Sequence, residues 1–289
     1  MPRLVLIGAE QFPHLRDALH QEARRADAPL TDLSVEAWGT AATPWVEVED
    51  GQLRAGLVGP GMDSGRGDEA LRPEDVFWCL FEKPLRKTGN AYLDTEHEAL
   101  RDGFHTCCPA RSINRRGLLA PLWTLAVWRL LASRLPVRQE ASVLRAPHFH
   151  LGSCPEDGRR WKPWPREAEF SRAQVWWTVP SPGALHLAVV MGSRVTLWPL
   201  ETPDTGGARP PSELVAELEA DLLQLAAACG ADVLEVLLVP STDSAGWTAL
   251  QLSALPEELE RLLASANPEA REQVEHFVRS LLPGREVAR

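Results

Sequence analysis

The strongest constraint on the fold is a segment near the end of the chain, because its residues alternate between strand-forming runs and turn formers. Val233 to Val239 consists of valine and leucine with one glutamate, Glu235, and Trp247 to Leu252 is a second, mostly apolar run. Ser241 to Gly246, between them, is polar and rich in turn residues. This pattern predicts two neighbouring strands joined by a turn, the second strand ending near Ser253 and Pro256.

A helix is expected immediately before this strand pair. Ser212 to Gly230 has apolar residues at helical spacing, and its glycine is placed where a helix commonly stops. The predicted order is therefore helix, strand, turn, strand.

These elements and their residues resemble the C-terminal core of the ATP-grasp ligases. In that family a pattern of the form GxDVxxVDxx, a turn, and LExNxxP supplies an acidic residue from the first strand and a glutamate and an asparagine from the second. Leu237, Gln251 and Ser253 stand at those three places here. The resemblance implies that these are the metal positions of the fold, with degenerate residues at Gln251 and Ser253.

The resemblance continues upstream as an ordered set of short matches, and it spans roughly residues 75 to 263. Gln174 to Leu197 is similar to a hairpin of the family, with His186 where an arginine that contacts the triphosphate is expected. Asn114 matches the entry to the nucleotide domain, but the lysine of that segment is absent. Lys162, in a Trp-Lys-Pro strand, matches the lysine that reaches the nucleotide phosphates. Lys162 and His186 are therefore the candidate nucleotide-binding residues.

The exchanged residues affect the ability of the site to bind Mg²⁺ and transfer a phosphoryl group. Mg²⁺ takes oxygen ligands, usually carboxylates together with substrate phosphates, and phosphoryl transfer depends on it to neutralise developing charge. Leucine offers no ligand, and glutamine and serine offer only neutral oxygens. No catalytic residue is assigned, although Glu235 or Asp243 could compensate by entering the site.

Two functional hypotheses follow. The first is a degenerate ATP-grasp protein, a pseudo-enzyme that binds a peptide, another ligand or an active ATP-grasp partner and has no assured cofactor. The second is an active ATP-dependent carboxylate–amine ligase that forms an acylphosphate on a peptide or amino-acid substrate and uses ATP and Mg²⁺. It would resemble peptide-modifying and ribosomal-protein-glutamylating enzymes. The number of exchanged positions favours the first.

The expected fold class is α/β and α+β, in three parts. Residues 1–105 alternate between helical and strand patterns, which predicts a small parallel sheet like the domain that precedes the ATP-grasp core. Residues 106–170 would form a small central subdomain, and 171–289 a C-terminal subdomain with terminal helices.

Local patterns assign the elements of the first part. The expected elements are a strand at Arg3–Ile7, a helix at Phe12–Ala26, an extended segment at Leu33–Trp38, a hairpin at Val46–Leu57 around Asp50-Gly51, a strand at Asp75–Leu80 and a helix at Thr95–Phe104. The glycine-rich loop Gly59–Gly67 lacks the Lys-Ser/Thr ending of a phosphate-binding loop, which favours a surface loop. In the last part, Pro256–Leu282 predicts amphipathic helices divided near Asn267-Pro268.

The net charge restricts the partners. With a formal charge of −10 and an isoelectric point of about 5.4, the chain opposes nucleic acid and anionic membranes. No run reaches transmembrane length, and the N-terminus reads as a strand, so the cytoplasm is the expected location. The oligomeric state is open.

Histidine and cysteine side chains offer two weaker metal sites. The five cysteines form no CxxC pair. His97, His105 and Cys107 could converge on zinc, and His148 with His150 could bind a metal or an anion. For these four histidines and Cys107, ordinary structural positions are favoured over metal binding.

Overall fold

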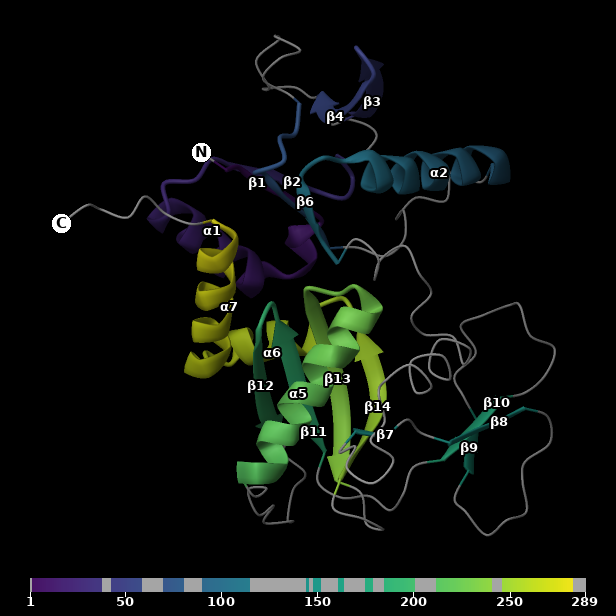
Figure 1. Ribbon diagram of the computed structural model, residues 1–289, viewed down its shortest axis with the longest axis vertical. Coiled ribbons are helices and arrows are strands. Elements are labelled where there is room, and N and C mark those ends of the chain that lie inside the picture. Colours follow the sequence, from purple (N-terminus) through teal and green to yellow (C-terminus); the bar gives the residue numbers. More distant parts are fainter. Residues whose placement is uncertain are drawn as a thin grey trace. The chain divides into compact units, whose positions relative to one another are not determined.

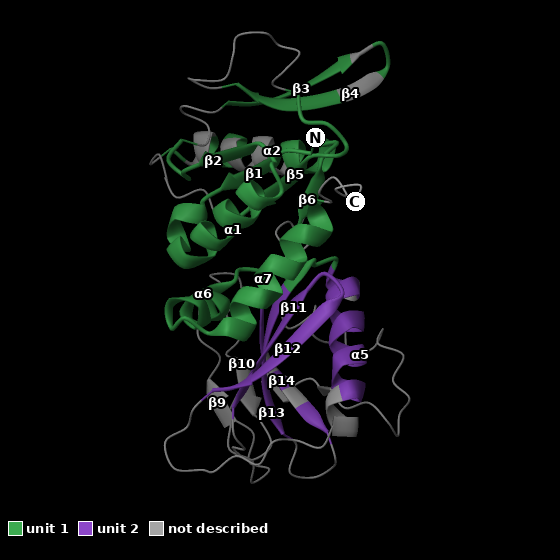
Figure 2. Ribbon diagram, turned by 90° about the vertical axis from the view of Figure 1, so that its left-hand side faces the viewer, with its two compact units in different colours: residues 1–120, 230–233, 254–289 green, residues 121–229, 234–253 purple. Residues whose placement is uncertain are grey.

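The computed structural model describes residues 2–37, 43–58, 70–80, 90–114, 144–145, 148–151, 161–163, 175–178, 185–200, 212–240 and 246–282. The chain forms two compact units (Figures 1 and 2). Unit 1 contains residues 1–120, 230–233 and 254–289, and unit 2 contains residues 121–229 and 234–253.

Unit 1 is built on a four-stranded parallel sheet of order β2-β1-β5-β6. Its strands are β1 (Leu4–Ile7), β2 (Leu30–Leu33), β5 (Val76–Cys79) and β6 (Arg111–Ile113). Every residue of β1 and β5 is buried. Such continuous apolar runs are typical of parallel strands covered on both faces.

Different elements cover the two faces of this sheet. Phe77 shares a buried cluster with Phe104 of α2 (Ala91–Cys107) and with Leu57 of a hairpin. Trp78 points the other way, because its ring packs edge-to-face on Phe277 at 5.8 Å. Successive strand residues face opposite sides of a sheet, so α2 and the hairpin cover one face and α7 (Pro268–Leu281) covers the other.

The hairpin consists of β3 (Thr43–Glu49) and β4 (Gln52–Val58). Asp50 and Gly51 both have positive φ, 53° and 76°. Two positive φ values in a two-residue loop match the twist of antiparallel strands, which explains the Asp-Gly pair. The hairpin expected from the sequence is confirmed.

The C-terminal helices α6 (Glu257–Ala264) and α7 belong to unit 1, and both pack against α1 (Pro13–Arg25). Asn267 begins α7 by accepting hydrogen bonds from the backbone of Glu269 and Ala270, at 3.0 and 3.1 Å. Pro268 follows at the first helical position, where its missing N–H is not needed. The break expected at Asn267-Pro268 is therefore present.

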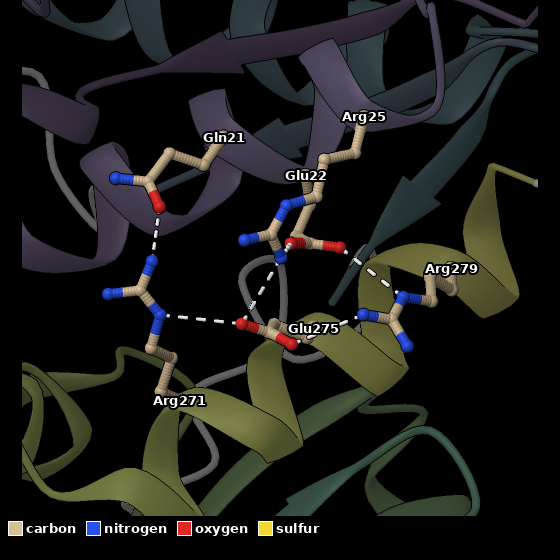
Figure 3. Close-up of polar contacts among 6 residues, drawn as sticks. All are labelled: Gln21, Glu22, Arg25, Arg271, Glu275 and Arg279. Carbon is tan, nitrogen blue, oxygen red and sulfur yellow. Dashed lines mark hydrogen bonds and ion pairs between the residues drawn. The ribbon is translucent and has the colours of Figure 1, made fainter.

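An ion-pair network links α1 to α7 (Figure 3). Glu22 is buried and contacts Arg25 and Arg279, the latter at 3.4 Å. Glu275 contacts Arg25 at 3.3 Å and Arg279 at 3.2 Å. The negative charges of Glu22 and then Glu275 raise the pKa of Arg25 above its ordinary value. A buried carboxylate is tolerated when cations and hydrogen bonds satisfy it, and two arginines do so for Glu22.

Unit 2 contains two sheets. The larger has the order β12-β11-β13-β14-β7 and is packed by α5 (Ser212–Cys229). Its strands are β7 (Leu144–Arg145), β11 (His186–Met191), β12 (Arg194–Pro199), β13 (Val233–Pro240) and β14 (Trp247–Ser253). The smaller, of order β8-β10-β9, is antiparallel and comprises β8 (His148–Leu151), β9 (Trp161–Pro163) and β10 (Val175–Thr178).

Asn114 joins three separate segments at the end of β6. It is completely buried. Its Nδ2 donates to the carbonyl oxygens of Val233 and Ala254, both at 2.8 Å, and its Oδ1 accepts from the N–H of Val233 at 2.7 Å. Its φ of 56° is left-handed, a conformation that asparagine tolerates better than most residues. Asn114 therefore ties β6 to the first residue of β13 and to the residue that follows β14.

One expectation differs from the structure. The extended segment expected at Leu33–Trp38 ends at its first residue, since β2 is Leu30–Leu33 and Ser34 starts a turn by accepting from the N–H of Ala37. The three-part division 1–105, 106–170 and 171–289 stays a prediction, and in the structure the terminal helices group with unit 1.

The mixed α/β and α+β class is confirmed. Loop Gly59–Gly67 lies outside the described residues. Among the helices that the structure describes, none combines the length and apolar character needed to cross a membrane.

Removing the Asn114 side chain tests its role as a tie. We expect Asn114→Gly to lower the free energy of unfolding by at least about 2 kcal/mol, because a buried peptide group left unpaired costs about 1–3 kcal/mol. Asn114→Ala should be less stable still, since a left-handed φ costs a residue with a Cβ about 1–2 kcal/mol. Urea unfolding followed by tryptophan fluorescence measures both. A Gly variant as stable as the parent would contradict this role.

Two glycines provide opposite tests of backbone conformation. Gly103 lies inside α2 with open space where a Cβ would stand, so Gly103→Ala should raise the free energy of unfolding by about 0.5–1 kcal/mol. Gly51 also has open space, but its φ of 76° should make Gly51→Ala destabilising by about 1–2 kcal/mol. Thermal melts of the two variants should move in opposite directions. A shift of the same sign in both would contradict the assigned conformations.

Candidate functional site

The strand pair β13–β14 carries the positions that the sequence singles out. Helix α5 ends at Cys229, and Gly230 follows with a φ of 62°, the left-handed conformation that often terminates helices. The chain then enters β13, which pairs antiparallel with β14. The predicted helix, glycine stop and neighbouring strands are all confirmed.

The register of this pair brings together the positions that the sequence resemblance predicts to be metal positions. Leu237 lies directly opposite Gln251, and Glu235 lies directly opposite Ser253. Residues directly opposite in an antiparallel pair have their side chains on the same face. These four residues therefore form one row on one face, and we call it the β13–β14 row.

A β-bulge ends the row. After the Leu237–Gln251 pair, Leu238 lies opposite Ala249, so Leu250 is an extra residue in β14. Such a bulge locally redirects side chains and often lies beside functional sites. Val236 and Leu252, which face away from the row, are buried together with Leu238 and Ala249.

Burial differs along the β13–β14 row. Gln251 is exposed, Leu237 and Ser253 are half-buried, and Glu235 is buried with only 4% of its surface exposed. The row thus offers one carboxylate, one amide and one hydroxyl group, with a leucine at the position of the family's first acid. Glu235 is the residue that could compensate for the missing acid, while Asp243 lies outside the described residues.

His186 lies at the other end of β14 from Ser253. It is the first residue of β11 and is buried, with its ring edge-to-face on Trp247 at a centroid distance of 4.8 Å. Trp247 begins β14 and Ser253 ends it. The structure therefore brings Gln251 and Ser253 together with Glu235, and it places His186 in an aromatic contact.

Lys162 lies in β9, opposite Trp177 of β10. The strand expected around it is confirmed, but its side chain lies outside the described part of the structure. A common surface for Lys162, His186, Gln251 and Ser253 stays a prediction.

Of the three proposed zinc ligands, the structure describes the side chains of His105 and Cys107. His105 is buried, with its ring 5.1 Å from Phe77 and its Nδ1 3.4 Å from the hydroxyl of Ser112. Among the residues with described side chains, no group of three His, Cys, Asp or Glu could hold a metal. His148 and His150 lie in β8, and their side chains are outside the described part of the structure.

Cysteine offers no nucleophile in α5. Burial raises the pKa of the Cys229 thiol to about 11, so it is protonated near neutral pH. Because the thiolate is the reactive form, a thiol in this environment is inert. No sequence pattern indicates two local features of the site, the bulge at Leu250 and the contact of His186 with Trp247.

The whole chain resembles known structures although its sequence does not match known families. No family model matches, and no curated protein matches. A RiPP-associated ATP-grasp ligase of Chryseobacterium gregarium, in complex with ADP and a leader and core peptide, is 11% identical with a TM-score of 0.64, over 98% of this chain and 97% of that one.

Two further solved structures agree. Macrocyclase MdnB of Microcystis aeruginosa MRC is 12% identical with a TM-score of 0.64, over 96% of this chain and 99% of that one. A RimK domain ATP-grasp protein of Sphaerobacter thermophilus is 13% identical with a TM-score of 0.54, over 95% and 99%. At such identities the similarity concerns the fold, and it extends over nearly the full length of each protein: the chain has the ATP-grasp fold of the peptide-modifying ligases.

Proposed function

We propose that this protein is a degenerate ATP-grasp protein that does not ligate and acts as a peptide-, ligand- or partner-binding component. The observation that carries the proposal is the cross-strand pair of Leu237 and Gln251. The two positions that resemble metal ligands lie opposite each other on one face. The register thus supports the sequence alignment from which we infer that the metal ligands have been lost.

The β13–β14 row does not fit a pair of magnesium ions. Mg²⁺ requires near-octahedral oxygen coordination and is usually held by one or two carboxylates together with phosphates. At the three matched positions, Leu237 has no donor atom, and Gln251 and Ser253 have neutral oxygens. A neutral oxygen does little to offset the cost of removing water from a doubly charged ion.

The residue that would contact the triphosphate is also exchanged. His186 replaces an arginine, and its ring is buried against Trp247. An arginine has a fixed positive charge and a planar set of donors that suits phosphate. A buried imidazole beside an indole has no permanent charge to offer. This substitution supports loss of triphosphate binding.

Peptides are the class of partner that the similar structures suggest. MdnC was crystallised with its precursor peptide MdnA, and ATP-grasp ligase PsnB with its precursor PsnA2 and AMPPNP. We propose a peptide as the ligand retained by this chain. An active ATP-grasp protein that shares such a peptide is the second partner we consider.

One observation favours the alternative of an active carboxylate–amine ligase. Glu235 lies in the β13–β14 row, two residues from Leu237 and opposite Ser253. A carboxylate there could take over a metal-binding role, with ATP and Mg²⁺ as cofactors. If so, Glu235→Gln should abolish any magnesium-dependent activity, and this distinguishes the alternative from the main proposal.

The first test is nucleotide turnover by the purified chain. We expect no phosphate release from ATP and no rise in melting temperature with ATP and Mg²⁺ relative to ATP with EDTA. Saturation at 100 times the dissociation constant would stabilise the folded state by about 2.7 kcal/mol, a shift of several degrees in melting temperature. A magnesium-dependent shift of that size, together with turnover lost in Lys162→Ala, would establish the ligase alternative.

The second test restores the ligand set. The combined variant Leu237→Asp, Gln251→Glu, Ser253→Asn should acquire a magnesium-dependent thermal shift with ATP, because it returns two carboxylates and an amide to the β13–β14 row. Ala220→Asp with Gln224→Glu is the matched control. It adds the same charge at exposed positions of α5 and should show no shift. Equal responses of the two variants would count against these positions as the metal site.

A further inference from the structure

The edge of β3 that faces away from β4 has a regular backbone, and its residues Val46 to Val48 are exposed. The hairpin is a sheet of two strands, and β3 pairs with β4 over seven consecutive residue pairs from Thr43–Val58 to Glu49–Gln52 without a register shift. Within the described residues, no other strand pairs with β3. Figures 1 and 2 show the hairpin as a separate ribbon at one end of unit 1.

Such an edge is unusual because proteins generally protect it. An open edge presents N–H and C=O groups that can pair with another chain, and natural edge strands are commonly short, bulged or rich in lysine. β3 has seven residues, no bulge and no lysine. Around the two-residue loop the N–H groups of Trp45, Glu47 and Glu49 face β4, so the outward donors that follow Pro44 are those of Val46 and Val48.

Apolar side chains accompany this edge. Val48 is 71% exposed and Val46 is 38% exposed. Both lie on the hairpin face of Ala55, which is buried, because Val46 lies opposite Ala55. The apolar face that packs into unit 1 at Ala55 therefore continues outward as exposed valine. A partner strand that placed apolar residues beside Val46 and Val48 would extend this buried layer.

The opposite face of β3 carries the negative charge of Glu47. Glu47 lies between the two valines in sequence and so on the other face, where its carboxylate is 4.0 Å from Arg54 of β4. An exposed pair at this distance is weak, and a carboxylate can accept several donors. A cation on a strand added to the outer edge would flank Glu47 on the side away from Arg54. Opposite charges directly across strands stabilise pairing.

We propose that the outer edge of β3 is a docking strand for an extended peptide segment whose side chains alternate between apolar and basic. The added strand would pair with the β3 backbone, bury Val46 and Val48 with its apolar residues and pair Glu47 with a basic residue, a known mode of peptide recognition. The inference rests on the proposed function only in taking a peptide as the ligand. It requires neither ATP nor the β13–β14 row.

Charge argues against a second copy of the chain at this edge. In the antiparallel two-fold register that would pair Val46 with Val48 of a second copy, Glu47 would lie opposite its own symmetry mate. Like charges directly opposite destabilise a strand pair. A basic partner avoids this repulsion.

Binding of defined peptides tests the proposal. The probes are three capped, fluorescently labelled peptides: alternating lysine and valine, alternating glutamate and valine, and a block arrangement of the first composition. We expect fluorescence anisotropy to show binding of the lysine–valine alternation alone. Val48→Lys should lower its affinity by about tenfold or more, the factor expected for losing one buried valine contact.

Matched variants make the result specific. Val58→Lys changes the same residue type at a valine that is 45% exposed but lies on the other face of the hairpin, so it should leave affinity unchanged. Glu47→Lys should weaken the lysine–valine peptide and allow the glutamate–valine peptide to bind. Far-ultraviolet circular dichroism and melting temperature verify that each variant is folded.

Three results would overturn the proposal. They are equal binding of the block peptide, equal losses in Val48→Lys and Val58→Lys, and no binding of any probe. A concentration-dependent dimer in light scattering, abolished by Val48→Lys, would assign the edge to a second copy and would also overturn it. ATP turnover by the chain would refute catalytic silence and leave the peptide result unaffected, so the two failures are distinguishable.

Discussion

The hydrogen bonds of Asn114 determine how the strands of the candidate site are held. One side chain binds both backbone groups of Val233 and the carbonyl oxygen of Ala254, immediately next to the Glu235–Ser253 pair. An asparagine has a donor and an acceptor in one plane, so it can continue the hydrogen bonding of a strand pair at its end. These bonds hold Val233 and Ala254, which flank the β13–β14 row in sequence, to the same side chain.

The fold can persist without its usual chemistry because stability and ligand binding depend on different faces of β13 and β14. Val236, Leu238, Ala249 and Leu252 are buried and supply the packing. The β13–β14 row lies on the other face, where exchanging two carboxylates for leucine and glutamine, and an amide for serine, would remove ligands and leave that core unchanged. The carboxylates of a metal site repel one another when no cation is present. Losing them therefore need not destabilise the protein.

Much of the fold was predictable where a local sequence signal had one structural outcome. Asp50-Gly51 produced the expected tight hairpin, Gly230 the expected helix stop, and Asn267-Pro268 the expected helix start. Ser34 ended β2 early because its side chain favoured a turn over an extended backbone. The grouping of α6 and α7 with unit 1 was not predictable, since it depends on partners such as Glu22 that lie far away in sequence.

The candidate site was predictable to the level of its strands and their pairing. The sequence pattern predicts that the strands carrying Leu237 and Gln251 are neighbours, and the register shows that the two residues lie opposite each other. The bulge at Leu250 and the packing of His186 on Trp247 have no counterpart in residue periodicity. Both arise from how neighbouring strands fit together.

Calorimetric titration of the unmodified protein with ATP in the presence of Mg²⁺ tests the central claim most directly. It measures binding itself, independently of turnover or of any substrate. With leucine, glutamine and serine at the three predicted metal positions, we expect no magnesium-dependent heat of ATP binding. Tight binding that disappears when Mg²⁺ is removed would contradict the account and would show that Glu235 or another group holds the metal.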